Sequence, residues 1–279
     1  HNGPPTWEFT MKLDRLTLGT FNLLNLNEPG KAIYTDADGW SQAEYDRKIE
    51  WCARILRLLK PDVFGFQELW HKDSLANFLT ASGLSGEYDA LVPADATGKG
   101  IVCAAIVRKG LLVGAPEWIV NFPEKFVLKS SGDDPQTPDI SVKVKKFSRP
   151  VLHFVIQPRD EFDPVHVYVC HFKSKGPTKV FNEDWFKADK PTYAKHQENL
   201  GSAISTIRRT AEASALRFIL SEQMKGTRTG VLVLGDVNDG QHSNTVNVLT
   251  EQPKYLVGDS VGGGDTSLYT AQTLQEYRN

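Results

Sequence analysis

The sequence predicts an α/β protein in which a β-sheet sandwich is flanked by helices. Short runs rich in Val, Ile and Phe alternate with a few stretches of helical periodicity. The helical stretches come first and last, with consecutive strand-like runs between them, which favours a sandwich over a simple βαβ repeat. The 279 residues include 40% hydrophobic and 24% charged side chains, with no internal repeat and no low-complexity linker. A single domain with a substantial core is the simplest interpretation.

The strands are predicted from short runs of β-branched and aromatic residues. In chain order they cover residues 16–21, 63–66, 101–107, 111–120, 141–147, 151–156, 165–170 and 231–234. Helices are predicted where apolar residues recur every three or four positions, over residues 43–60, 72–82 and 193–223. Pro61 and Gly83 end the first two of these helices. Turn-rich composition predicts long loops over residues 27–41, 129–139 and 176–192.

Charge and cysteine content exclude several classes of protein. The formal net charge is -2, so the chain is not a basic scaffold that coats nucleic acid by charge alone. Cys52, Cys103 and Cys170 stand singly in apolar surroundings, which predicts buried thiols rather than disulfides or a zinc site. No apolar run approaches the ~20 residues of a membrane helix. No signal segment is visible, which slightly favours a cytoplasmic location, and no protein partner can be inferred.

Four of the predicted strands end at a polar side chain. Asn22, Glu68, His171 and Asp236 each follow an apolar run, and Asn238 stands two residues after Asp236. Mg²⁺ or Mn²⁺ takes oxygen ligands, usually one or two carboxylates with waters and substrate phosphate. Glu68 and Asp236 meet that requirement, while amides can orient a phosphate without adding negative charge. A histidine at the same edge could hold a phosphate oxygen or stabilise charge in the transition state.

Each of these residues also has a plainer explanation. An acidic residue after a strand is more often a turn residue or helix cap than a ligand. A single histidine at a strand end is more often exposed or hydrogen-bonded than catalytic. The occurrence of all four endings in one chain favours a metal site for phosphate chemistry.

The segments TFNLLN, KPDVFGFQE, HFKSK and VLVLGDVND resemble the endonuclease/exonuclease/phosphatase superfamily. It includes deoxyribonuclease I-like nucleases, inositol polyphosphate phosphatases and neutral sphingomyelinases. The resemblance covers residues 16–249, and PDVFGFQE with GDVND at their mutual distance is its specific part. It implies a four-layer fold, two mixed β-sheets packed face to face with helices outside. Residues 1–15 would then be an extension or expression remnant, and residues 16–279 the domain.

The resemblance also implies a role for each matched residue. Glu68 would be the principal metal ligand, with Asn22 beside it. Asp236 would join them at the metal and activate or position the attacking water. Asn238 would orient the phosphate, and His171 would bind it and stabilise its pentavalent transition state.

Arg149 and Lys173 are also predicted to bind substrate phosphate. Arg149 matches a position where nucleases of the superfamily often carry an arginine. Lys173 and Lys175 alternate with His171 and could extend its face toward a phosphate backbone, although solvated surface lysines are the plainer interpretation. Trp185 and its aromatic neighbours could stack on bases or only pack their loop.

One feature of the superfamily is missing from the sequence. Its members end with a strand that bears an Asp-His pair, and this chain contains no Asp-His dipeptide. Residues 274–279 resemble the loop before that strand, so we expect a truncated sequence rather than a degenerate member. If these residues were the whole protein, very weak or no catalysis would follow.

Three functions are compatible with this pattern. A metal-dependent phosphodiesterase or nuclease is favoured, because HFKSKGP followed by a long helix resembles bacterial nuclease members of the superfamily more than its lipid phosphatases. A phosphomonoesterase or phospholipase-like member is the second hypothesis, and a catalytically inactive binding module is the third. The expected partner is nucleic acid or another phosphate ester.

Overall fold

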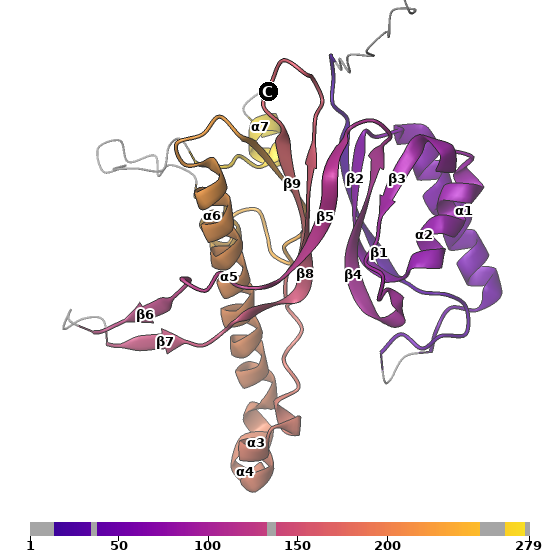
Figure 1. Ribbon diagram of the computed structural model, residues 1–279. Helices are drawn as coiled ribbons and strands as arrows, with labels where there is room; N and C mark the ends of the chain where they lie inside the picture. The colour runs from indigo at the N-terminus through magenta and orange to yellow at the C-terminus, as the bar shows by residue number, and fades with distance from the viewer. Residues whose placement is uncertain (1–13, 35–37, 133–137, 252–265, 277–279) are drawn as a thin grey trace, which may run out of the picture. The chain divides into compact units, whose positions relative to one another are not determined.

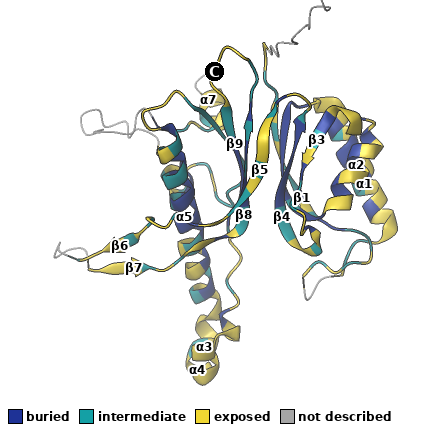
Figure 2. Ribbon diagram, in the orientation of Figure 1, coloured by how far each residue is buried: buried dark blue, intermediate teal, exposed yellow. Residues whose placement is uncertain are grey.

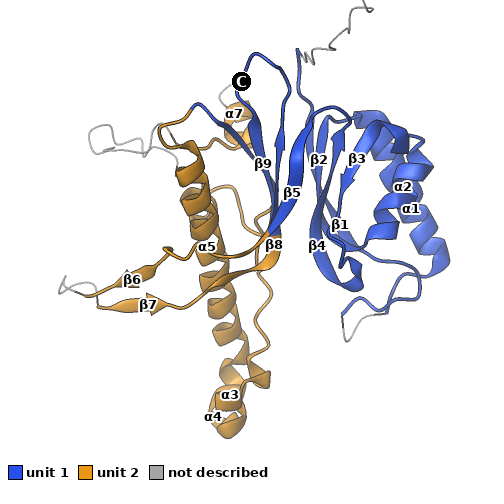
Figure 3. Ribbon diagram, viewed as in Figure 1, with its two compact units in different colours: residues 1–118, 151–170, 228–235 blue, residues 119–150, 171–227, 236–279 orange. Residues whose placement is uncertain are grey.

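A computed structural model describes residues 14–34, 38–132, 138–251 and 266–276 (Figure 1). The chain forms two compact units, each assembled from three segments (Figure 3). Unit 1 comprises His1–Trp118, Val151–Cys170 and Arg228–Gly235, and unit 2 comprises the remainder. Most of the predicted extension, residues 1–13, lies outside the described residues, and the boundary at residue 16 stays a prediction.

Unit 1 contains a four-stranded mixed sheet with the order β1-β2-β4-β3. β1 (Leu18–Leu26) and β2 (Val63–His71) are parallel. β4 (Thr97–Arg108) is antiparallel both to β2 and to β3 (Tyr88–Leu91). The short helix η1 (Ser85–Glu87) leads into β3.

Two helices, α1 (Gln42–Leu59) and α2 (Lys72–Ser82), lie along one face of this sheet (Figure 1). The helix α1 begins at a capping box in which Ser41 and Glu44 exchange hydrogen bonds, and it ends at Lys60 in the left-handed conformation. The two helices bury their apolar stripes against one another and against side chains of β1, β2 and β4. This burial, rather than helix propensity, supplies most of their stability.

The second four-stranded sheet has the order β10-β9-β8-β5. Its strands are β5 (Leu112–Asn121), β8 (Lys146–Ile156), β9 (Val165–His171) and β10 (Gly230–Asp236). β8 and β9 are antiparallel. Gly230 lies beside Val165 and Gly235 beside Cys170, so β10 runs parallel to β9.

The two sheets pack face to face in unit 1 through alternate residues of their strands. Val63 of β2 shares a buried cluster with Phe154 of β8 and Val169 of β9, and Figure 2 shows these strands mainly in the colours of buried and intermediate residues. Gly65 marks a close approach between the sheets. A Cβ at this position would lie 3.0 Å from Val169 Cγ2 and 3.3 Å from Leu234 Cβ.

Unit 2 is built around the long helix α5 (Gln197–Met224), with α6 (Asn244–Thr250) packed along it. Phe218 of α5 meets Phe126 edge to face, with ring centroids 6.1 Å apart. The strands β6 (Leu128–Ser130) and β7 (Ile140–Val142) form an antiparallel hairpin. The remaining short helices are η2 (Val180–Asn182), α3 (Asp184–Ala188), α4 (Lys190–Tyr193), η3 (Ala194–His196) and α7 (Ala271–Glu276).

The predicted fold class, two mixed sheets packed face to face with helices outside, is confirmed. The helix over residues 72–82 has the predicted bounds, and the three cysteines are free and buried as expected. Other details were wrong. Residues 141–147 are divided between β7 and β8, and the long helix begins at residue 197 rather than 193. Residues 176–192 carry short helices, as do residues 274–276, which were expected to be a loop.

Besides the short helices of residues 176–192, the described elements that were not predicted are η1, β3, β6, α6 and α7. They have three to seven residues each, too few to establish a period in the sequence. Residues 35–37, 133–137 and 277–279 of the predicted loops lie outside the described residues. Within the part of the chain that the structure describes, every helix is too short or too polar to cross a membrane.

Candidate active site

Glu68 lies at a bulge inside β2 rather than at the end of the strand. The register with β4 shifts between Phe66 and Leu69, so Glu68 is passed over by the pairing. Its φ is 58°, in the left-handed region that residues other than glycine rarely adopt. A bulge re-aims one side chain and is common beside active sites. The strand ends predicted at Glu68 and Asn22 were wrong, because β2 continues to His71 and β1 to Leu26.

The Glu68 carboxylate is held at both of its oxygens by β1. Asn22 Nδ2 donates a hydrogen bond to Oε1 at 3.0 Å, and the Asn25 backbone N–H donates to Oε2 at 2.9 Å. The Asn22 Oδ1 accepts from the Leu24 N–H at 2.9 Å, which fixes the orientation of the amide. Leu24 and Asn25 have φ values of 51° and 54°, so β1 departs from regular strand geometry at the same level.

Asn25 is a further residue of this site, and it was not predicted from the sequence. Its Oδ1 accepts hydrogen bonds from the Trp70 indole N–H and the Tyr34 hydroxyl, each at 3.1 Å. Its backbone carbonyl accepts from the Trp40 indole N–H at 2.7 Å. These three aromatic donors hold Asn25 in the conformation that directs its N–H at Glu68. A clue was present in the sequence, since Asn tolerates the left-handed conformation better than most residues.

A second group of predicted residues gathers around the Phe172 peptide in unit 2. The Phe172 N–H donates to the Asp236 backbone carbonyl at 3.0 Å. The Phe172 carbonyl accepts from Arg149 Nη1 at 3.0 Å and from Asn238 Nδ2 at 2.9 Å. The Asp236 carboxylate accepts from the Asn238 N–H at 2.8 Å, in a turn where Asn238 has a φ of 53°. His171 ends β9 and Asp236 ends β10, as predicted.

Burial sets the ionisation of His171 and Lys173. His171 is 3% exposed, and burial, followed by the nearby Arg149 charge, lowers its pKa to about 4 although Asp236 acts in the opposite direction. The imidazole is therefore neutral near pH 7 and can donate a hydrogen bond without carrying charge. Burial also lowers the pKa of Lys173, with Arg149 and Arg209 adding to the effect.

Lys173 is less suited to its predicted role than Arg149. Its ammonium donates to the Ser174 carbonyl at 3.3 Å, to Ser174 Oγ at 3.2 Å and to the Gly176 carbonyl at 3.0 Å. All three donors of the ammonium are thus directed at its own loop. A phosphate would have to displace one of these contacts to bind there.

Asp239 anchors the loop that follows β10. Burial tends to raise its pKa, but hydrogen bonds from Thr245, Lys175, the Gly240 N–H and Arg209 outweigh burial and hold the pKa well below its usual range. The Thr245 hydroxyl lies 2.7 Å and Arg209 Nε 3.3 Å from Asp239 Oδ2. Arg209 is itself only 4% exposed. The loop that carries Asn238 is therefore fixed to α5 and α6.

Glu68 together with Asn22 and Asn25, referred to below as the Glu68 group, offers the kind of oxygen ligands that a hard divalent cation prefers. It offers a partly exposed carboxylate whose orientation is fixed, with an amide beside it. Mg²⁺ typically takes one or two carboxylates and keeps several waters, so a full protein cage is not required. Asn22 orients Glu68 in this structure, and its further role as a ligand stays a prediction, as does that of Asp236.

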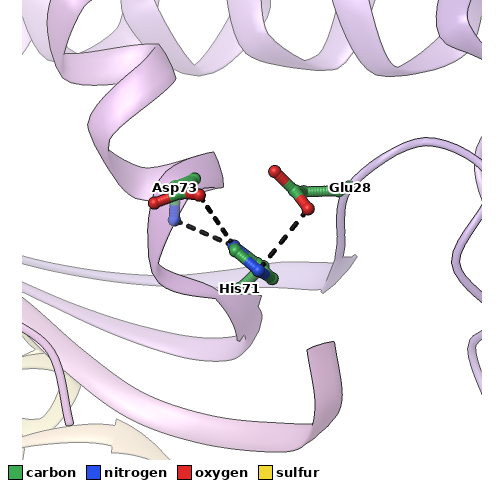
Figure 4. A group of neighbouring side chains, drawn as sticks. All are labelled: Glu28, His71 and Asp73. Atoms are coloured by element: carbon green, nitrogen blue, oxygen red, sulfur yellow. Dashed lines mark hydrogen bonds and ion pairs between the residues drawn. The ribbon is translucent and has the colours of Figure 1, made fainter. Parts of the chain in front are cut away.

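Another cluster of ligand-type side chains lies elsewhere in unit 1. Glu28, His71 and Asp73 place one ligand atom each within 4.8 Å of one another (Figure 4). His71 Nδ1, however, accepts from the Asp73 N–H at 3.1 Å as the N-cap of α2, and Lys31 Nζ lies 2.7 Å from Glu28. Helix capping and an ion pair account for this group, and a cation would have to displace both. This cluster was not predicted from the sequence.

No family model and no curated protein matches the sequence. Solved structures do match it. An endonuclease/exonuclease/phosphatase family protein from Bacteroides thetaiotaomicron has a TM-score of 0.50 at 17% identity, covering 85% of this chain and 68% of that one. A β-hairpin deletion mutant of beta toxin from Staphylococcus aureus has a TM-score of 0.51 at 14% identity, covering 85% and 73%. A mannosyl-6-phosphatase from B. thetaiotaomicron has a TM-score of 0.49 at 17% identity, covering 85% and 70%.

The first two of these structures, whose TM-scores reach 0.50, show that the chain has the deoxyribonuclease I-like fold of the endonuclease/exonuclease/phosphatase proteins. The predicted resemblance is confirmed at the level of the fold. A fold of this kind hosts more than one chemistry, so the activity must be argued from the residues of the site.

Proposed function

We propose that the protein is a metal-dependent hydrolase of phosphate esters, with phosphodiesters such as nucleic acid as its favoured substrates. The observation that carries the proposal is the Glu68 carboxylate, which accepts hydrogen bonds at both oxygens from Asn22 and Asn25. Glu68 itself lies at a β-bulge with its backbone in the left-handed region. Strained backbone of this kind persists only where the surroundings enforce it and is concentrated at functional sites. It presents a fixed carboxylate, which is what a Mg²⁺ or Mn²⁺ site requires.

The bound ion would be held by Glu68, with Asn22 as a further ligand, and would act as a Lewis acid toward the phosphate. Arg149 and the neutral His171 would bind the non-bridging phosphate oxygens. Asp236 would position the attacking water, whose oxygen bonds to phosphorus as the ester P–O bond breaks. Asn238, fixed by its hydrogen bond to the Phe172 carbonyl, would orient the phosphate.

Hydrolysis assays with four substrates test this function. Protein expressed from the complete gene is incubated with Mg²⁺ or Mn²⁺, or with a chelator as the control. The substrates are plasmid DNA, RNA, bis-p-nitrophenyl phosphate and p-nitrophenyl phosphate. Metal-dependent cleavage of at least one diester is expected. Hydrolysis of the monoester alone would overturn the diester preference, and inactivity on all four would overturn the proposed function in favour of a binding module.

A further inference from the structure

Glu212 is a buried carboxylate in the middle of α5 that no motif of the sequence singles out. It is 0% exposed. Its Oε1 accepts a hydrogen bond from the Ser148 N–H and its Oε2 accepts one from the Lys173 N–H, both at 2.7 Å. The two amides come from different segments, Ser148 from β8 and Lys173 from the loop after β9. One carboxylate thus joins the helix to both segments.

The two amides flank the residues proposed to bind phosphate. Ser148 directly precedes Arg149, and Lys173 follows His171 and Phe172. The Phe172 carbonyl in turn accepts from the Arg149 guanidinium at 3.0 Å. The spacing between the Arg149 segment and the His171 segment is therefore fixed at two points, once by Glu212 from α5 and once by Arg149 itself.

Arg209, one turn before Glu212, donates hydrogen bonds to backbone carbonyls of the loop that contains Lys173. Its Nη1 donates to the carbonyls of Lys173 and Ser174, both at 3.4 Å, and its Nε donates to Asp239 at 3.3 Å. The Lys173 residue is thereby held from α5 at both its N–H and its carbonyl. Glu212 and Arg209 lie on one face of the helix because they are three residues apart.

The chemistry of Glu212 suits two converging donors. A carboxylate has two acceptor oxygens, whereas the amide of Gln has one acceptor and one donor group in the same shape. An apolar residue would leave both N–H groups buried without acceptors, which folded proteins avoid. A glutamine would satisfy one N–H and direct its own NH₂ at the other.

We propose that Glu212 is a positioning residue, which holds Arg149 and His171 at the separation needed to bind one phosphate group. This inference rests on the proposed function. It adds a residue that touches neither substrate nor metal but sets the geometry of the phosphate-binding residues. Misplacement of a binding group by about 1 Å can cost an enzyme roughly 100-fold.

The test is a double-mutant cycle between Glu212→Gln and Arg149→Ala, with bis-p-nitrophenyl phosphate and Mn²⁺. Glu222→Gln is the matched control, because it makes the same change at an exposed position of α5. Glu212→Gln is expected to lower kcat/KM by roughly 10- to 100-fold, and Glu222→Gln by less than about twofold. In the Arg149→Ala background, Glu212→Gln should cause only a small fraction of the loss that it causes in the wild-type background, because the arginine that Glu212 positions is absent. Fully additive losses, or equal activity of the two glutamine variants, would overturn the proposal.

A second readout does not require turnover. Hydrogen exchange should show protected Ser148 and Lys173 amides in the wild type, and lower protection at these two positions in Glu212→Gln while the rest of α5 is unchanged. Loss of protection throughout the unit would indicate a general structural role and overturn the specific one. If the wild type hydrolyses none of the esters, its affinity for inorganic phosphate replaces activity in the cycle. Coupling of Glu212 to Arg149 in phosphate affinity would then support the positioning role of Glu212 although the proposed hydrolase function had failed. The absence of coupling would refute the positioning role as well as the proposed function.

Discussion

Asn25 is the position at which the Glu68 group is predicted to be most sensitive to substitution. Asn25→Ala removes the Oδ1 that accepts from the Trp70 indole N–H and the Tyr34 hydroxyl. Trp70 is 4% exposed, so its N–H would lose its acceptor away from water, at a cost of about 1–3 kcal/mol. Alanine at a φ of 54° adds about 1 kcal/mol, because it keeps a Cβ in the left-handed region but lacks the short polar side chain that lets asparagine adopt this conformation. We expect the free energy of unfolding to fall by about 2–4 kcal/mol.

Urea denaturation followed by tryptophan fluorescence measures this loss. Asn25→Gly is the matched variant, because it removes the same acceptor but has no Cβ to strain. Its loss should be smaller than that of Asn25→Ala by about 1 kcal/mol. A loss below about 1 kcal/mol for Asn25→Ala would refute the acceptor role, and equal losses for the two variants would refute the role of backbone conformation.

Three further predictions concern other parts of the molecule. His171→Ala should reduce kcat on the order of 100-fold while metal-dependent thermal stabilisation persists, because we propose that the imidazole is a transition-state donor rather than a metal ligand; a nearly normal rate would make His171 structural. Gly65→Ala should destabilise the protein by about 1–3 kcal/mol through overpacking between the sheets, whereas Gly86→Ala, where a Cβ meets nothing within 4 Å, should be nearly neutral in thermal melts; equal melting temperatures would contradict the close approach. The pKa of His166 is lowered by burial and by His153. As the pH falls below about 6.5, the His166 imidazole is therefore protonated in the unfolded chain before it is protonated in the folded one. The free energy of unfolding should accordingly decline more steeply with falling pH in the wild type than in His166→Gln. Urea denaturation of both proteins from about pH 8 to about pH 5 measures this decline, and equal declines in the two proteins would refute the reasoning.

Local signals in the sequence predicted the elements that local chemistry defines. The helix α2 was predicted with its observed bounds, and its end was recognisable because Gly83 follows it. The structure adds that His71 caps its start. The ends of β9 and β10 at His171 and Asp236 were likewise predicted, since each strand stops where its apolar run stops. The candidate residues themselves followed from these endings and from a family resemblance.

The remaining features depend on contacts between distant residues. The bulge at Glu68 exists because β2 pairs with two strands whose registers both shift there, and no pattern within β2 specifies this. Asn25 acquires its role from Trp40 and Trp70, which are 15 and 45 residues away. Glu212 acquires its role from amides 64 and 39 residues away. Its sequence context, a polar residue in a long helix, predicts an exposed position instead.

The central claim is that Glu68 holds a catalytic divalent metal ion, and Glu68→Gln tests it most directly. This substitution keeps the length and shape of the side chain but removes its charge. Thermal melts with and without Mn²⁺ should show a metal-dependent rise in melting temperature for the wild type, with none for Glu68→Gln. Metal-dependent cleavage of bis-p-nitrophenyl phosphate should be lost in the same variant. A Mn²⁺-dependent rise in Glu68→Gln equal to that of the wild type would contradict the account.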